Sequence, residues 1–478
     1  MNVNGFPQAD NSQGKATNPA DSVTCIYSPL APERGNRVFY ALLIMQRPLI
    51  FGLIFTLAAI QLHAEEQPLN LESAFGAVEK VNVNVLVSRE SISQAIANSN
   101  QQRVNLLPHV NLDAQQKRTH SVSIANDIPS DGGITNRFDG KLTGTYNLLS
   151  PAQIASYRAA RRGVGVAESD YQQTLQGVLT SVAQTYFLHQ RNQQRIIVLD
   201  ANIERARVLL DLAKRQLDAG VATQIDVTRA EAQVAVSEQA RLQQDTTVVQ
   251  SDLQLKRLLD LDAGAAVKLV PFNVRRVNQD LFGASYDKTA LEQRADYSKA
   301  QKTLEQNKEN LRAAKYQRLG TLNLFGEYGY ATGVAFDGKD RTAWLGGVDF
   351  NIPVFDGLRA NADKRAALAQ VRSQEFRLRS TELLISSELR LAAQDARSRY
   401  AQVDVAERSL RLSHDELRLA QRRYEQGVAD NREVVEAQNR LAQADDNLVE
   451  AVYQYNLSRL ELARAKGEVR AILSEKAN

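Results

Sequence analysis

The chain has little of several residue types: its 478 residues include one cysteine, one tryptophan and 11 prolines. So few prolines favour long uninterrupted helices, because proline breaks a helix interior. The mean hydropathy is low, at −0.36. It excludes a polytopic helical membrane protein, which needs several apolar runs of about 20 residues. The cysteine, Cys25, has no apolar stretch before it and does not resemble a lipidation site.

The sequence also lacks the patterns that mark nucleic-acid, metal or catalytic sites. The formal net charge is +3 and the chain has no run of lysine or arginine, which gives no reason to expect a nucleic-acid partner. Its five histidines are not in metal-ligand spacing, and no glycine-rich phosphate loop, nucleophile elbow or paired His/Cys motif occurs. We therefore expect no enzyme activity, no cofactor and no bound metal.

The N-terminus has the features of an export signal. Residues 1–37 are polar and without pattern, whereas Met45 is followed by a basic residue and an apolar run over residues 48–60. The sequence Leu62-His63-Ala64 then resembles a signal-peptidase site. We predict a signal peptide over 45–64, cleaved after Ala64, with residues 1–44 as an upstream extension. The alternative is a transmembrane anchor from Val38 to Leu62.

A duplicated helical hairpin dominates the rest. In each copy, apolar residues recur at alternating spacings of three and four, which is a heptad seam that requires a partner helix. Gly220 and Gly427 follow the two seams as left-handed helix ends, and a capping box at Thr223–Asp226 opens the returning helix. These glycines stand 207 positions apart, as do Leu253 and Leu460. The seams consist of Ile196, Leu199, Ile203, Ala206, Leu210, Ala213 and Leu217, and of Val403, Ala406, Leu410, Ser413, Leu417, Ala420 and Tyr424.

The hairpins belong to two repeats with the same order of elements. We expect a first repeat with its linker over 65–285, a second over 286–469, and a short tail over 470–478. In each repeat the expected order is a helix, two strands, a long helix and a shorter helix. The expected helices cover about 69–103, 151–217, 225–261, 288–316, 358–427 and 431–467, and the expected strands about 110–114, 138–148, 322–330 and 344–352, with a polar loop between the first two.

The strands indicate a membrane. Each alternates, with one apolar face that mostly carries aromatic residues, which is typical of a transmembrane β-barrel strand. Four strands cannot close a barrel, since the smallest known have about eight. Three chains would supply twelve. The predicted fold class is therefore mainly α with a transmembrane β portion. The alternative is two amphipathic hairpins packed on a soluble core.

The sequence resembles the TolC-type outer membrane efflux protein family. The resemblance covers about Leu69 to Val469 and rests on the ordered duplication, the Leu107-Pro108 strand entry, the turn at Val354-Phe355-Asp356-Gly357, and the two hairpin glycines. The first repeat departs from that turn, with Leu149-Ser150-Pro151 in its place. The resemblance implies a homotrimer with a twelve-stranded β-barrel in outer membrane lipid and a periplasmic α-helical tunnel.

The resemblance also implies a function. The chain would be the outer membrane exit duct of a tripartite efflux or type I secretion system, and the sequence does not distinguish the two. Its partners would be a periplasmic adaptor protein and an inner-membrane pump or ABC transporter. The adaptor would meet the hairpin tips, at Gly220-Val221 and Gly427-Val428. The alternative is a non-conducting coiled-coil structural or adhesion protein of the cell envelope.

Two acidic residues match the family positions that ring the periplasmic entrance. They are Glu433 and Glu436, one helical turn apart, so both can face one side. Three chains would bring six carboxylates into one narrow ring, which attracts cations and repels anions. For Glu433 the alternative is a capping box, as at its counterpart Asp226. Glu436 has Arg229 as its counterpart.

The resemblance also implies a latch, that is, a hydrogen bond between neighbouring hairpins that keeps the entrance closed. Tyr424 matches a family tyrosine that bonds an acid of the neighbouring hairpin, and Asp226 matches that acid. The alternative is that Tyr424 is a seam residue, as Leu217 is in the other copy. The family's gate arginine corresponds to Ala429 here, which leaves part of the closing network open; Arg432 is nearby.

Overall fold

The computed structural model describes residues 68–125, 127–271, 291–335, 338 and 341–474. The predicted extension over 1–44 and the signal peptide over 45–64 lie outside these residues. The described residues belong to one compact unit, His63–Asn478. Within the described ranges, no helix combines the length and the apolar character that crossing a membrane requires.

Among its described residues, the first repeat has four helices and two long strands. They are α1 (Leu71–Val81), α2 (Val83–Val104), β2 (His109–Ala125), β3 (Ile128–Leu149), α3 (Pro151–Asp218) and α4 (Gln224–Leu258). The second repeat follows the same order. Its elements are α6 (Ala295–Tyr316), the 3-10 turn η2 (Gln317–Leu319), β5 (Thr321–Thr332), β6 (Arg341–Asn351), α7 (Arg359–Glu425) and α8 (Asn431–Ala465), followed by α9 (Ala471–Ser474). The elements follow the expected order, except that the single helix expected over about 69–103 is divided into α1 and α2 at Asn82, whose backbone is extended and caps both helices.

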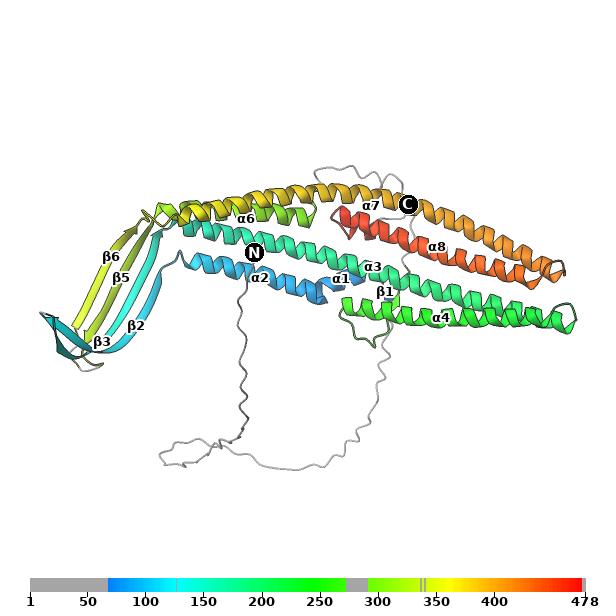
Figure 1. Cartoon of the computed structure of the whole chain (residues 1–478), viewed down its shortest axis with the longest axis horizontal. Coiled ribbons are helices and arrows are strands. Elements are labelled where there is room, and N and C mark those ends of the chain that lie inside the picture. Colours follow the sequence, from blue (N-terminus) through cyan, green and yellow to red (C-terminus); the bar gives the residue numbers. More distant parts are fainter. Residues whose placement is uncertain (1–67, 126, 272–290, 336–337, 339–340, 475–478) are drawn as a thin grey trace, which may run out of the picture. The chain divides into compact units, whose positions relative to one another are not determined.

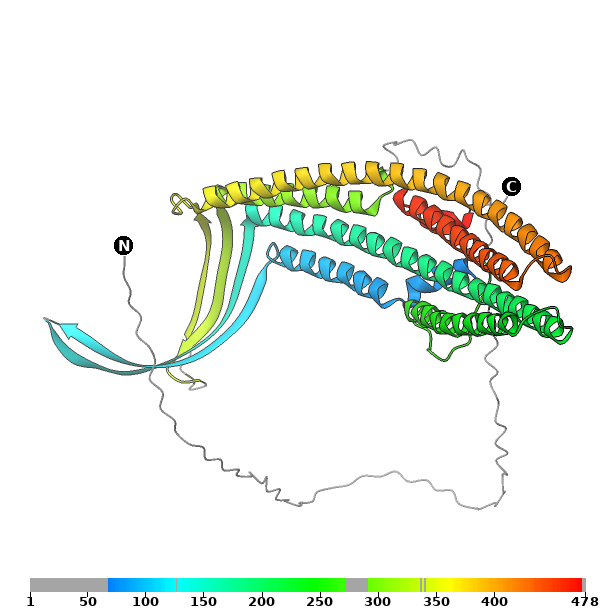
Figure 2. The same ribbon diagram turned by 45° about the vertical axis from the view of Figure 1, so that its right-hand side comes forward.

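Each long helix has two shorter helices beside it (Figure 1). α3 contains 68 residues and packs against α2 and α4, and α7 contains 67 and packs against α6 and α8. At about 1.5 Å per residue, each long helix spans roughly 100 Å. α3 also contacts α6 and α8, so the two repeats are joined along the helices. Figure 2 shows the hairpin tips at the opposite end of the helices from the strands.

The largest apolar cluster fixes α1, α3 and α4 together. Phe75, Leu179, Tyr186 and Leu255 are nearly inaccessible to solvent and belong to this cluster. The Tyr186 hydroxyl lies within hydrogen-bond distance of two carbonyl oxygens, those of Leu69, at 3.1 Å, and Val270. These carbonyls flank a parallel pair of two-residue strands, β1 (Pro68–Leu69) and β4 (Lys268–Leu269). This pair could not be predicted from the sequence, because two residues are too short for any periodicity.

The long strands form one antiparallel sheet in the order β2-β3-β5-β6. The expectation of a polar loop after residue 114 is wrong. β2 and β3 instead continue as a paired ribbon to a turn at Asp127, which has a φ of 62°. The pairing shifts once, between His120 and Val122. In this ribbon the apolar residues are not gathered on one face. Its strands therefore do not show the alternation that marks the rest of the sheet.

Candidate functional site

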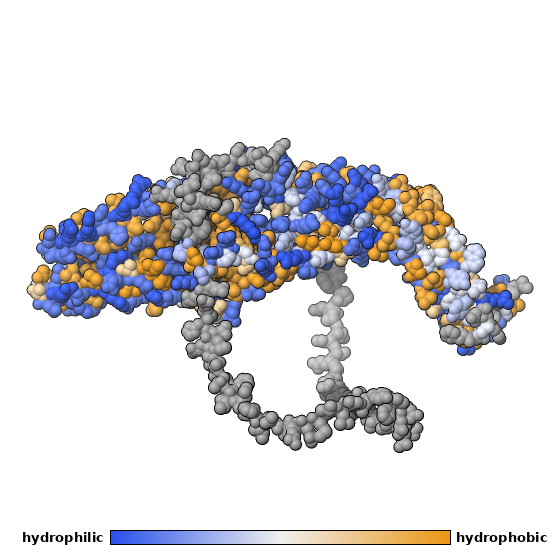
Figure 3. All heavy atoms as spheres, turned by 180° about the vertical axis from the view of Figure 1, so that it is seen from behind, coloured by the Kyte–Doolittle hydropathy of each residue, from blue (hydrophilic) through white to orange (hydrophobic). Residues whose placement is uncertain are grey.

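One face of the sheet is apolar and exposed. The register places Leu112, Leu142, Tyr328 and Trp344 in one row across all four strands. Each is largely exposed, and Trp344 keeps 81% of its surface accessible. Apolar side chains gather over the part of the sheet next to the helices (Figure 3). Exposed patches of this kind mark a membrane or protein contact, so this face needs a partner outside the chain.

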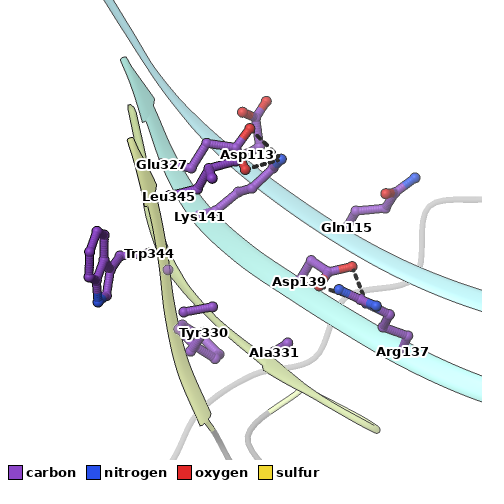
Figure 4. A pocket seen from close by; sticks show the side chains of 12 residues that line it. Asp113, Gln115, Arg137, Asp139, Lys141, Glu327, Tyr330, Ala331, Trp344 and Leu345 are labelled. Carbon is purple, nitrogen blue, oxygen red and sulfur yellow. Dashed lines mark hydrogen bonds and ion pairs between the residues drawn. The ribbon is translucent and has the colours of Figure 1, made fainter. Parts of the chain in front are cut away.

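The other face of the same strands is charged. Lys141 on β3 lies 3.1 Å from Glu327 on β5, and Arg137 pairs with Asp139 at 2.9 Å. These side chains line a hollow on one side of the sheet, whereas Trp344 points away on the other (Figure 4). The sheet therefore separates an apolar surface from a polar one, as a transmembrane barrel wall does.

The hairpin tips have matching backbone geometry. Gly220 and Gly427 have φ values of 74° and 71°. After each glycine, a valine N–H reaches back to the helix, from Val221 to the Gln216 carbonyl at 2.8 Å and from Val428 to the Arg423 carbonyl at 2.9 Å. These are paired Schellman ends. The side chains of both valines are exposed. The tips therefore present the same small apolar surface twice.

Two side-chain amides join the hairpins near these tips. Asn431 Nδ2 donates to the Asp226 carbonyl oxygen at 2.9 Å, and Gln216 Nε2 donates to the Tyr424 carbonyl oxygen at 3.4 Å. Asn431 is completely buried. Sequence reasoning missed both amides, because their partners are backbone atoms more than 200 residues away, and no residue type signals such a contact.

The predicted hydrogen bond between Tyr424 and Asp226 is not formed. Asp226 Oδ2 accepts from the Thr223 N–H at 3.0 Å and from the Thr223 hydroxyl at 2.6 Å, in the capping box of α4. The Thr223 hydroxyl is the main cause that lowers the pKa of Asp226. Within the described residues, the buried Tyr424 hydroxyl has no hydrogen-bond partner. Burial and the nearby Asp226 charge raise the pKa of Tyr424. The Asp226 carboxylate therefore caps α4 and does not bond Tyr424.

Tyr424 is instead part of the tip core. It packs in an apolar cluster of α7 and α8 that also receives a side chain from α3. The cluster consists of Leu209, Leu417, Ala420, Tyr424, Val434, Ala437 and Leu441. A tyrosine buried among leucines without a hydroxyl partner contributes mainly apolar contact, so the interpretation of Tyr424 as a seam residue describes this geometry.

Both entrance acids are paired with arginines of their own hairpin. Arg423 lies 2.6 Å from Glu433, and Arg432 lies 2.8 Å from Glu436. Asp430 caps α8 by accepting the Glu433 N–H at 3.3 Å. The Glu433 side chain thus bonds across the tip rather than in a capping box. All four paired side chains are at least one-third exposed, so the carboxylates remain open to ions in solution.

Farther from the tips, ion pairs join α3 to α8. Basic side chains on α3 face acidic ones on α8, with all six only partly exposed. The pairs are Arg191–Glu450 at 2.6 Å, Arg195–Asp446 at 2.6 Å and Arg205–Asp445 at 3.1 Å. Partly buried pairs of this kind are sensitive to the loss of one partner. The tip contacts therefore lie at the end of a longer polar seam between the hairpins.

Comparisons agree with this architecture. Residues 78–260 and 288–468 match the outer membrane efflux protein family. Nodulation protein T of Rhizobium leguminosarum bv. trifolii is 23% identical over 78% of this chain and 80% of its own length. The pyoverdine export outer membrane protein OpmQ of Pseudomonas aeruginosa is 25% identical over 81% and 84%.

A solved structure has the same fold. The Campylobacter jejuni CmeC outer membrane channel is 20% identical and superposes with a TM-score of 0.75 over 85% of this chain and 89% of its own. The helical tunnel, the barrel strands and the location in the outer membrane, all expected from the sequence, are confirmed. The chain belongs to the outer membrane efflux protein family.

Proposed function

We propose that three copies of this chain form a passive exit duct, through which substrates delivered by an inner-membrane transporter leave the cell. The main observation is the sheet order. Within the described residues, the outer strands β2 and β6 each pair with one neighbour only. Unpaired edges are avoided in membranes. If β6 of one copy pairs with β2 of the next, three copies close a ring of twelve strands.

The two faces of the sheet support the same arrangement. The row from Leu112 to Trp344 would face lipid, and the charged face with Lys141 and Glu327 would line water. The helices would continue the barrel as a tunnel on the periplasmic side. Its far end is formed by the tips at Gly220 and Gly427, where we place the contact with a periplasmic adaptor protein.

The tips would also close the duct at rest. Asn431 and Gln216 tie one hairpin to the other in each chain, and three chains would repeat these bonds around the entrance. Glu433 and Glu436 would give the entrance its preference for cations. The polar seam between α3 and α8 would hold the upper hairpins while the tips separate.

The name of one relative supports a substrate class. OpmQ is named for pyoverdine export, which favours small molecules over secreted proteins as the cargo. We therefore place the chain in a tripartite efflux system with an adaptor and an inner-membrane pump.

Planar-bilayer recording tests the proposal. The purified protein should be a trimer, as judged by cross-linking, and should insert as discrete conducting units. A trimer that inserts without conductance would favour the alternative, a coiled-coil structural or adhesion protein. A matched variant, Trp344→Asp, places a carboxylate on the lipid-facing row. It should reduce insertion, since a basic residue on the lipid face of a barrel costs up to about 2–4 kcal/mol and a carboxylate somewhat less.

A further inference from the structure

In the part of the sheet nearer the helices, the charges lie on one face; farther out on β2, Arg118 has an even number and lies on the other. In the paired ranges 109–117, 137–149, 321–331 and 341–351, every charged residue has an odd number. The register puts these residues on a single face, since directly opposed pairs include Asp113 with Lys141, and Lys117 with Arg137. They are Asp113, Lys117, Arg137, Asp139, Lys141, Glu327, Arg341 and Asp349. In the proposed barrel, this face lines the lumen.

Four of these charges cancel locally. Lys141 pairs with Glu327 on the neighbouring strand, and Arg137 pairs with Asp139 on its own strand. Figure 4 shows both pairs in the same hollow. Neither pair therefore adds net charge to the lumen.

Four charges remain without an ion-pair partner among the described residues: Asp113, Asp349, Lys117 and Arg341. Asp113 accepts one hydrogen bond, from the Thr143 hydroxyl at 2.9 Å, which leaves its charge in place. All four side chains are exposed. The net field inside the barrel depends on these four.

The unpaired charges are sorted by sign along the strands. β2 runs away from the helices and passes Asp113 before Lys117, whereas β6 runs toward them and passes Arg341 before Asp349. On both strands, the acid is therefore nearer the helices. At about 3.3 Å per residue, the acid and the base are roughly 13 Å apart on β2 and roughly 26 Å apart on β6.

We infer that the barrel lumen is bipolar, with an acidic zone next to the helical tunnel and a basic zone toward the outer mouth, and that it passes ions more readily in one direction of applied voltage. Three copies would place six unpaired charges in each zone. The inference rests on the proposed trimeric duct and extends it to the selectivity of the barrel. It assigns Asp113, Asp349, Lys117 and Arg341 as selectivity-determining residues.

The dimensions make the effect measurable. Twelve strands spaced about 4.8 Å apart and tilted about 40° give a barrel roughly 24 Å across between backbones. The Debye length is about 30 Å at 0.01 M salt and about 3 Å at 1 M. The fixed charges therefore control the whole lumen in dilute salt and almost none of it in concentrated salt.

The direction follows from the order of the zones. With the periplasmic side positive, cations enter through the acidic zone and anions through the basic zone. Both accumulate where the zones meet, and the conductance rises. The opposite voltage draws both ions out of the lumen, and the conductance falls. Efflux of a cation would thus meet an attractive zone first, whereas a cation approaching from outside would meet a repulsive one.

Single-channel current–voltage curves of the full-length trimer in potassium chloride test this. At about 0.01 M salt the currents at equal and opposite voltages should differ, and at about 1 M they should match. Neutralising all four residues, with Asp113→Asn, Asp349→Asn, Lys117→Gln and Arg341→Gln, should abolish the difference. An unchanged conductance at 1 M salt would show that this variant retains an intact pore.

Paired variants separate the zones. Asp113→Asn with Asp349→Asn should shift the reversal potential in a salt gradient toward anion selectivity, and Lys117→Gln with Arg341→Gln should shift it toward cation selectivity. The matched control, Lys141→Gln with Glu327→Gln, also removes two charges, but a neutral pair, and should keep the wild-type asymmetry.

The outcomes distinguish this inference from the proposed function. Symmetric wild-type currents at low salt would overturn the bipolar lumen and leave the duct intact. An asymmetry that persists in the four-residue variant would also overturn it, because the source would then lie elsewhere, for example at Glu433 and Glu436. Absence of conductance in the wild-type trimer would instead contradict the duct itself.

Discussion

Asn431, the first residue of α8, donates its side-chain amide to the backbone carbonyl of Asp226 in the first turn of α4, at 2.9 Å. The bond joins the starts of the two returning helices, and Asn431 is fully buried there. A net contribution of about 0.5–1.5 kcal/mol is usual for such a bond. Three copies would give about 1.5–4.5 kcal/mol on the same basis. Moving a two-state gate from 1:99 to 99:1 takes about 5.5 kcal/mol, so this contact is large enough to shift the resting state.

We therefore expect Asn431→Ala to raise the resting conductance of the duct in planar bilayers. Tyr424→Phe is the matched control, since it removes a hydroxyl that has no hydrogen-bond partner in the described structure and leaves the apolar contacts of the ring. It should conduct like the wild type. The reverse pattern, with Tyr424→Phe open and Asn431→Ala closed, would restore the bond between Tyr424 and Asp226 that the family resemblance implies.

A second prediction concerns the entrance acids. Glu433→Gln with Glu436→Gln should reduce cation selectivity and block by divalent ions, because the carboxylate ring is lost. Arg423→Gln with Arg432→Gln should do the opposite, since it leaves both carboxylates without their basic partners. Exposed pairs contribute at most about 1 kcal/mol each, so both double variants should fold. Reversal potentials in a salt gradient measure both effects, and equal values in the two double variants would remove these acids from the filter.

Local patterns predicted much of this fold. The heptad seams, the glycine ends at 220 and 427 and the capping box at Thr223 depend on neighbours within a few residues, so the sequence alone identified them. The long ribbon beyond residue 114 was missed because its alternation carries no apolar face. The contact from Asn431 to Asp226 was missed for a different reason, as it depends on a backbone atom 205 positions away.

In the described structure, a local bond replaces the one expected between Tyr424 and Asp226. Tyr424 and Asp226 are near enough for the charge of one to affect the pKa of the other. Asp226 nevertheless bonds Thr223, three residues away, as a helix cap does. A capping box is local and forms with the helix itself, whereas the latch requires two hairpins to be brought together. The family resemblance indicated the correct region, but there Asp226 bonds Thr223 and not Tyr424.

A third prediction concerns the tips. Gly427→Leu forces a side chain into a left-handed conformation, with a φ of 71°, at a cost of about 1–2 kcal/mol. It also adds bulk beside the exposed Val428, so export with an adaptor should fall while the trimer persists. The control is Gly177→Ala, inside α3, where an added Cβ meets nothing within 4 Å. It should stabilise the helix by about 0.5–1 kcal/mol and leave export unchanged. Normal export by Gly427→Leu would show that the adaptor binds elsewhere.

The last prediction concerns pH and a buried histidine between α3 and α4. His189 is 3% exposed, and its Nδ1 lies 2.9 Å from the Ser251 hydroxyl. Its Nε2 faces the side-chain amide nitrogen of Gln193 at 3.0 Å. An amide nitrogen is a donor, so Nε2 accepts and the ring is neutral, with its proton on Nδ1.

Burial is the main cause that lowers the pKa of His189; the nearby Asp252 opposes this shift, and Lys256 adds to it. The unfolded chain therefore takes up a proton at a higher pH than the folded chain does. Stability from this group is complete above the unfolded value of about 6.5 and is lost as the pH falls below it. The thermal midpoint of the trimer should accordingly decrease between about pH 6.5 and pH 5.

His189→Gln should flatten this part of the curve, because glutamine does not titrate and can still bond Ser251. His414→Gln is the matched control, since His414 lies exposed on α7, and it should keep the wild-type slope. Thermal unfolding followed by circular dichroism across this range measures all three proteins. An equal slope in His189→Gln and the wild type would show that the acid sensitivity comes from groups other than His189.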